Sequence, residues 1–68
     1  MSDRIMNIYM LQIGKCYRLI TNMGYFDKVC YFKGFDYEWA VFINKEGNRE
    51  IVHTADLWRD NPIIIKPV

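Results

Sequence analysis

The residue types that could do chemistry in this sequence are few and widely spaced. His53 is the single histidine and Ser2 the single serine, so spacing places no nucleophile beside a base. Asp36 and Glu38 are two residues apart and would share one face of a strand, where paired carboxylates could act as acid and base. The simpler explanation of the two carboxylates is that they lie on the solvent-exposed face of a strand. The simpler explanation of His53 is a partly exposed position in a strand. We therefore expect no catalytic residue and no enzymatic activity.

Cys16 and Cys30 raise the question of a disulfide. If residues 15–21 and 25–33 form a hairpin centred on Met23, the two cysteines face each other directly. The chain begins without the apolar run of a secretory signal, so we expect a cytoplasmic protein in which both thiols are reduced. One histidine and two distant cysteines, with no C-x-x-C pair, do not make a zinc site. The sequence predicts neither a metal nor a cofactor.

The composition indicates one small folded domain with more aromatic side chains than its core can enclose. The chain has 68 residues, of which 51% are apolar and 16% aromatic, so it is not disordered. A core of this size buries roughly 60% of the unfolded surface. Some of the eleven rings (five Tyr, four Phe, two Trp) should therefore reach the surface, where Tyr and Trp favour interfaces. The net charge of +1 lacks the basic surplus of a non-specific nucleic-acid binder, and no apolar run is long enough to span a membrane.

Hydrophobic patterning predicts an all-β fold. Odd positions from 35 to 43 are apolar or aromatic while positions 36, 38 and 44 are polar, which is the alternation of a half-buried strand. This pattern places Trp39 in the core, because Val41 and Ile43 continue the same apolar face. Trp58, in a short turn, is expected to be exposed.

The remaining elements complete a small five-stranded barrel. Ser2 or Asp3 could cap a short helix that starts at Arg4, so residues 1–13 are expected to form an N-terminal helix or arm and residues 14–68 the barrel. Gly34 is expected to end or bulge the second strand. The other strands are predicted at 16–21, 26–33, 49–54 and 63–65, with turns at 22–24 and 44–48 and a 3₁₀ turn at 55–58 before the last strand.

The order of these elements resembles the SH3-like barrel. Glu38-Trp39-Ala40 resembles the aromatic start of the third strand in SH3 domains, and Asp56-Leu57-Trp58 stands where they place the 3₁₀ turn before the last strand. In that family, aromatic side chains of the first long loop, the third strand and the 3₁₀ turn line a peptide groove. The resemblance implies a partner-binding groove formed by Tyr25, Tyr37, Trp39 and Trp58.

A second resemblance is to bacterial Sm-like (Hfq-type) proteins, which combine an N-terminal helix with five strands in a ring-forming barrel. Phe35-Asp36 before an apolar strand, and His53 in the fourth-strand region, are similar to their two motifs. Aromatic residues interleaved with Lys28 and Lys33 also suit base stacking beside cations. This resemblance implies RNA binding through Phe35, Asp36, His53, Lys28 and Lys33.

These observations favour a small non-enzymatic binding module. The main hypothesis is a protein-binding accessory or inhibitory protein, of the kind that phages and mobile elements encode, which acts through exposed aromatic side chains. An Sm-like RNA-binding oligomeric ring is the alternative. A further alternative is sequestration of a small ligand, such as a nucleotide, in a pocket between subunits. We expect a cytoplasmic protein with a protein partner and no membrane association, and a homo-oligomer is compatible with all three hypotheses.

Overall fold

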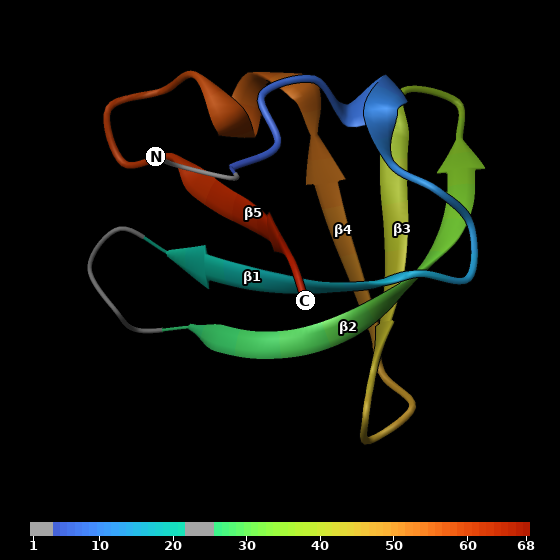
Figure 1. Ribbon diagram of the computed structural model, residues 1–68. Coiled ribbons are helices and arrows are strands. Elements are labelled where there is room, and N and C mark those ends of the chain that lie inside the picture. Colours follow the sequence, from blue (N-terminus) through green and yellow to red (C-terminus); the bar gives the residue numbers. More distant parts are fainter. Residues whose placement is uncertain (1–3, 22–25) are drawn as a thin grey trace.

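A computed structural model describes residues 4–21 and 26–68 and shows an all-β protein (Figure 1). The caps expected at Ser2 or Asp3, the turn expected at 22–24 and Tyr25 lie outside the described residues. The elements, in chain order, are η1 (Ile8–Met10), β1 (Cys16–Thr21), β2 (Asp27–Asp36), β3 (Trp39–Asn44), β4 (Arg49–His53), η2 (Thr54–Leu57) and β5 (Ile63–Pro67), where η denotes a 3₁₀ turn.

The five strands form one antiparallel sheet in the order β4-β3-β2-β1-β5. Figure 1 shows β2 curving from the layer that contains β1 to the layer that contains β3, so that the sheet wraps around its own interior. The edge strands β4 and β5 each pair with one neighbour and, within the described residues, not with each other. The predicted all-β class, the five strands and the 3₁₀ turn before the last strand are therefore confirmed, but the sheet is open.

A β-bulge allows β2 to take part in both layers. The register passes from Phe32 opposite Phe42 to Gly34 opposite Val41, so β2 gains one residue relative to β3. Gly34 has a φ of 135°, a conformation that residues with a side chain rarely adopt. The extra residue brings Phe35 back to the side of Phe32, and the two ring centroids are 5.2 Å apart. The predicted bulge is confirmed, although β2 continues beyond it.

A hairpin turn interrupts the alternating run at 35–43, which is therefore not one strand. Asp36, the last residue of β2, pairs with Trp39, the first residue of β3, and leaves Tyr37 and Glu38 as the turn. Tyr37 has a φ of 56°, in the left-handed region that large side chains rarely occupy. The turn lacks the Asn-Gly or Asp-Gly pair that usually marks a tight hairpin. The prediction that Asp36 and Glu38 share one strand face is also wrong, because the chain reverses between them.

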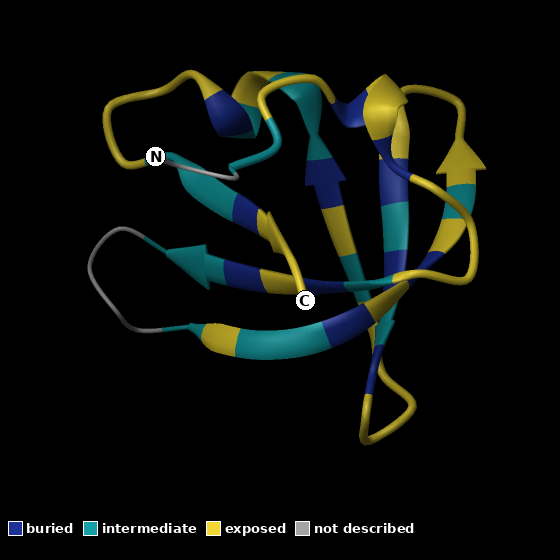
Figure 2. Cartoon of the chain, in the orientation of Figure 1, coloured by how far each residue is buried: buried dark blue, intermediate teal, exposed yellow. Residues whose placement is uncertain are grey.

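The core lies on the opposite face of β3 from the one predicted. Ala40, Phe42 and Asn44 are buried, whereas Trp39 is 39% exposed. The prediction of a buried Trp39 is therefore wrong, and Figure 2 shows buried and less buried positions alternating along β3. The apolar core contains Ile8, Leu11, Tyr17, Leu19, Cys30, Phe32, Ala40, Phe42, Val52, Leu57 and Ile65.

The N-terminal segment, within its described residues, is an arm with one 3₁₀ turn and not an α-helix. Ile8 and Leu11 are buried and fill the interior from one side. Ile5 lies beside the edge of β5 that does not pair with β1, where the Ile5 N–H donates to the carbonyl of Ile65 at 2.7 Å. None of the helical segments described in the structure has the length and apolar character needed to cross a bilayer.

Candidate functional site

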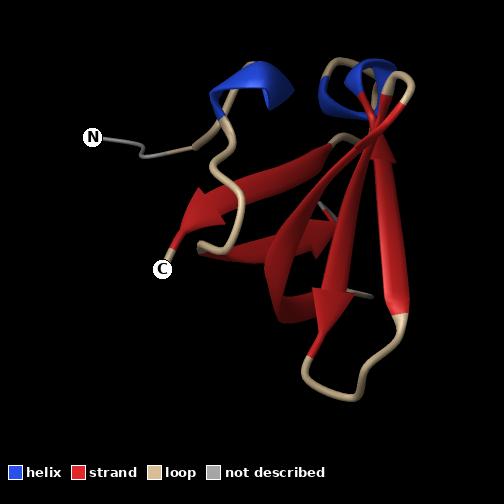
Figure 3. Ribbon diagram, turned by 90° about the vertical axis from the view of Figure 1, so that its right-hand side faces the viewer, coloured by secondary structure: helices blue, strands red, loops and turns tan. Residues whose placement is uncertain are grey.

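Exposed aromatic side chains gather at the end of the sheet where η1, η2 and the β2–β3 turn lie. Figure 3 shows both 3₁₀ turns at this end, and Figure 2 shows exposed positions over η1 and the β2–β3 turn. Tyr9 is 66% exposed, Tyr37 95% and Trp58 61%. We call this surface the aromatic end; its rings are those of Tyr9, Phe35, Tyr37, Trp39 and Trp58. Exposed apolar surface of this kind is typical of interaction sites.

Phe35 connects the part of the aromatic end that contains Tyr9 to the core. Its ring lies against the buried ring of Phe32 on one side and against Tyr9 on the other, with a centroid distance of 5.4 Å to Tyr9. Ile13, farther along the arm, reaches the bulge, since its Cδ1 atom lies 3.7 Å from the position that a Cβ on Gly34 would occupy. The bulge and the arm together therefore position Tyr9 and Phe35 as one unit.

His53 supports the part of the aromatic end that contains Trp39. Its ring meets Trp39 edge-on at a centroid distance of 4.9 Å. The His53 Nδ1 atom accepts a hydrogen bond from the N–H of Ala55 at 3.0 Å, and Nε2 lies 3.5 Å from Glu38. The His53 N–H in turn donates to the Asp56 carboxylate at 2.9 Å. These contacts make His53 the N-cap of η2, a structural role that also fixes the ring beside Trp39.

Trp58 is exposed because the residue before it, Leu57, is the one that η2 directs into the core. Leu57 is buried in the core. Trp58 follows it as the C-cap of the turn, and its N–H donates to the carbonyl of Ala55 at 3.2 Å. Consecutive residues of such a tight turn point to different sides. The predicted exposure of Trp58 is therefore confirmed.

Two ion pairs between carboxylates and arginines lie at the aromatic end among the described residues. Asp36 lies 4.0 Å from Arg49, and Asp56 lies 3.4 Å from Arg59. Glu38 faces His53, as described above. Because acidic and basic groups alternate here, the surface presents no block of one sign, and its distinguishing feature is the cluster of rings.

The residues expected to bind RNA do not form one surface. Phe35, Asp36 and His53 lie at the aromatic end. Lys28 lies near the other end of β2, where its Nζ atom is 3.6 Å from a Glu46 oxygen and 5.4 Å from the ring centroid of Phe26. Lys33 is exposed at the bulge. The structure therefore separates Lys28 from Phe35, Asp36 and His53.

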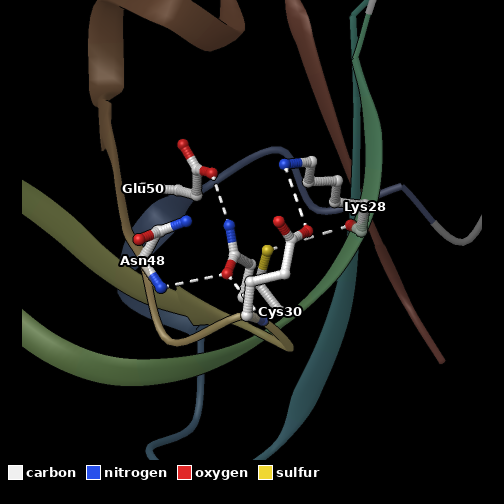
Figure 4. Close-up of polar contacts among 6 residues, drawn as sticks. Lys28, Cys30, Asn48 and Glu50 are labelled. Atoms are coloured by element: carbon white, nitrogen blue, oxygen red, sulfur yellow. Dashed lines mark hydrogen bonds and ion pairs between the residues drawn. The ribbon is translucent and has the colours of Figure 1, made fainter.

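Asn44 anchors the turn at the far end of the sheet and was not predicted as an important residue. Figure 4 labels two of the residues that Asn44 bonds to, Asn48 and Glu50. The Asn44 Nδ2 atom donates to the Glu50 carboxylate at 2.9 Å. Its Oδ1 atom accepts from the N–H groups of Glu46 at 2.9 Å and Asn48 at 3.0 Å. Asn44 is 3% exposed, and these three bonds satisfy it. An asparagine at the start of a turn was a recognisable signal.

The two cysteines do not face each other. Cys16 pairs with Tyr31, and Cys30 pairs with Tyr17, so the hairpin register differs by one residue from the predicted one and the cysteines lie on opposite faces. Both are free thiols. Burial, followed by the charge of Glu50, raises the pKa of Cys30, which makes this thiol a poor nucleophile at neutral pH. The described residues contain no group of side chains suited to holding a metal ion.

Comparison of the chain with protein-family profiles, curated proteins and solved structures found no match. The candidate site therefore rests on geometry. Of the four residues predicted to bind a partner, Tyr37, Trp39 and Trp58 lie at the aromatic end, and Tyr25 is outside the described residues. Tyr9 was missed because the sequence pattern of residues 1–13 did not show which of its side chains would be exposed.

Proposed function

We propose that this chain is a small protein-binding module with an SH3-like architecture, and that its partner docks on the aromatic end. The strand order β4-β3-β2-β1-β5 and the 3₁₀ turn before β5 support the architecture. The proposed role is that of an accessory or inhibitory protein, which acts by occupying a surface of its partner.

The observation that carries this proposal is the exposure of five aromatic rings on elements that meet at one end of a small sheet. Aromatic side chains dominate the energetics of protein interfaces, because each buries a large area with few rotatable bonds. Tyr37 adds a second argument. It occupies an unfavourable backbone conformation with 95% of its surface exposed, and backbone strain of this kind clusters at functional positions.

The same geometry favours a protein partner over RNA. Single-strand binders place rings beside unpaired cations, whereas Arg59 at the aromatic end faces Asp56, and the Arg49 side chain, which comes from the start of β4, faces Asp36. Of the two lysines expected to bind RNA, Lys28 lies elsewhere and faces Glu46, and Lys33 is the single one exposed near the bulge. A gel-shift titration with uridine-rich and adenine-rich oligonucleotides at low salt tests this choice. We expect no shift, and a salt-sensitive shift would favour RNA instead.

The proposal is tested with two variants that leave the fold intact. Tyr37→Asn removes the ring and suits the left-handed backbone better than tyrosine does, and Trp58→Ala removes an exposed ring. Tyr31→Ala is the control, because Tyr31 is an exposed aromatic residue in the middle of β2, away from the aromatic end. Each protein is immobilised and used to capture partners from a lysate of the organism that encodes it, with quantitative mass spectrometry as the readout.

We expect proteins captured by the wild type to be captured equally by Tyr31→Ala and about tenfold less by the other two variants. Circular dichroism establishes that each variant is folded. Equal capture by all four proteins would show that the aromatic end is not the docking surface.

A further inference from the structure

The backbone of β4 has an unpaired edge. The Asn44 N–H donates to the Asn48 carbonyl at 3.0 Å, and bonded pairs alternate in an antiparallel ladder. Glu50 and Val52 therefore bond to β3, and the N–H and C=O groups of Arg49 and Ile51 point away from the sheet. No other strand in the described part of the chain pairs with this edge.

The opposite edge, that of β5, is protected. Ile5 bonds to Ile65 from the arm, and Pro67 has no N–H to offer. Natural proteins usually block exposed edges in such ways, because a free edge templates the binding of another strand. Among residues 4–21 and 26–68, no such device covers Ile51, which is 50% exposed at the centre of β4.

An apolar cavity opens beside the free edge. It has a volume of about 180 Å³ and lies between β4 and the pair β1–β5, with walls from Leu19, Phe26, Val52 and Ile63. Ile51 also lines it, so the cavity and the free edge are contiguous. A side chain of a strand added to β4 could therefore fill it.

Glu50 is the one charged residue among the described residues that line this cavity. One oxygen of its carboxylate, Oε2, accepts a hydrogen bond from Asn44. Within the described part of the chain, no hydrogen bond or ion pair reaches the other oxygen, Oε1. The nearby Lys28 is paired with Glu46 instead, as Figure 4 shows. The cavity therefore combines apolar walls with a partly exposed carboxylate that has one oxygen open to a cationic group.

We propose that β4 and this cavity bind an extended segment of a partner protein, which pairs with Arg49 and Ile51 as an added strand and places a lysine or arginine side chain in the cavity. Main-chain hydrogen bonds supply affinity in strand addition, and side-chain pockets supply specificity. Long basic side chains suit this cavity because their alkyl stems pack on apolar walls while the charged head reaches a carboxylate. This site uses the backbone of Arg49 and Ile51 and none of the rings of the aromatic end, although the Arg49 side chain reaches Asp36 there, so it does not depend on the aromatic end.

The first experiment selects ligands from a display library of random linear peptides on the immobilised wild-type protein. Ile51→Pro removes an edge N–H that makes no bond to β3, and Ile51→Ala is its matched control. Glu50→Gln removes the charge and retains an oxygen that can accept from Asn44. We expect selected peptides to carry a lysine or arginine, and to bind Ile51→Pro about tenfold more weakly than Ile51→Ala.

The second experiment isolates the charge. Replacing the basic residue of a selected peptide by norleucine should lower its affinity for the wild type about tenfold and leave its affinity for Glu50→Gln nearly unchanged. Tyr37→Asn and Trp58→Ala should bind the peptides as the wild type does. This last result separates the site from the aromatic end, so that either surface can fail alone.

Three outcomes would overturn the proposal. One is a library that yields no peptide, or only peptides that bind Ile51→Pro and Ile51→Ala equally. Another is a wild-type oligomer, detected by light scattering, that Ile51→Pro converts to a monomer, since a second copy would then occupy the edge. If Ile51→Pro does not fold, amide hydrogen exchange of the wild type decides, and a selected peptide that fails to slow exchange at Arg49 and Ile51 would also overturn it.

Discussion

The two faces of β3 have similar hydrophobicity and different surroundings. The inner face carries Ala40, Phe42 and Asn44, all buried, and the outer face carries Trp39, Val41 and Ile43, which are half-buried or exposed. The outer face is at least as apolar as the inner one. What separates them is the curvature of the sheet, which surrounds one face with other strands and leaves the other to solvent. Large apolar side chains on the outer face are therefore available to bind a partner.

The largest expected effect is that of Phe42→Ala. The Phe42 ring has no exposed surface and lies 5.3 Å from the Phe32 ring and 6.3 Å from the Tyr17 ring, measured between centroids. Its removal should lower the free energy of unfolding by about 3–5 kcal/mol. Urea denaturation followed by tryptophan fluorescence measures this loss. Val41→Ala, on the outer face of the same strand, is the control, and a similar loss for both variants would contradict the distinction between the faces.

Asn44→Ala tests the polar end of the inner face. It removes three hydrogen bonds and leaves the N–H groups of Glu46 and Asn48 without their acceptor, so we expect a loss of about 2–3 kcal/mol in the same denaturation experiment. Asn44→Asp keeps the acceptor but sets a second carboxylate against Glu50. That variant should therefore be less stable than the wild type at neutral pH and recover as acid protonates the pair. An Asn44→Ala variant as stable as the wild type would show that the turn does not need this side chain.

Trp39→Ala should separate binding from stability on the outer face. The ring contacts His53 edge-on but is partly exposed, so we expect a loss of about 1 kcal/mol in unfolding free energy. Capture of the partner of the aromatic end should fall by about tenfold or more. A large loss of stability with unchanged capture would assign Trp39 to the core, and would sink its role in binding.

The smallest expected effect comes from the exposed ion pair between Arg18 and Asp27. The Arg18 guanidinium donates two hydrogen bonds to Asp27, at 2.7 and 2.6 Å, and this bonding lowers the pKa of Asp27. Because the pKa of Asp27 is lower in the folded state, the pair stabilises the fold at every pH above the unfolded-state pKa of about 3.9. This contribution disappears as the pH falls through the folded-state pKa. The melting temperature of Asp27→Asn should therefore lie slightly below that of the wild type at pH 6.

Two further measurements sharpen this last prediction. The difference in melting temperature between Asp27→Asn and the wild type should vanish in acid, once Asp27 is protonated in both states. It should also shrink in high salt, because exposed charges are screened. A difference that grows as the pH falls would contradict the direction of the pKa shift.

Local signals predicted much of the fold. β1 was expected at 16–21, where the structure has it, because a polar glycine-containing segment bounds this short apolar run on each side. The turn at 44–48, the bulge at Gly34 and the 3₁₀ turn before β5 were also predicted from glycine, asparagine and proline. These residues limit the backbone locally, so their effect can be recognised without knowing what packs around them.

The turn at Tyr37 and Glu38 could not be recognised in that way. No glycine or asparagine marks it, and the apolar alternation continues across it by coincidence. Tyr37 takes the left-handed conformation because the paired strands β2 and β3 close the chain there. The error in this turn reversed the assignment of the faces of β3, since a shift of one residue moves every side chain to the other face.

The amino-acid sequence by itself determined an all-β chain of five strands, and an aromatic surplus that one small core cannot enclose. It did so because period, turn residues and composition act over short distances along the chain. Only the tertiary structure decided which face of β3 is buried, which rings meet at the aromatic end, and that β4 keeps a free edge beside an apolar cavity. Each of these depends on the curvature of β2 and on contacts between segments far apart in the sequence, which no local pattern encodes.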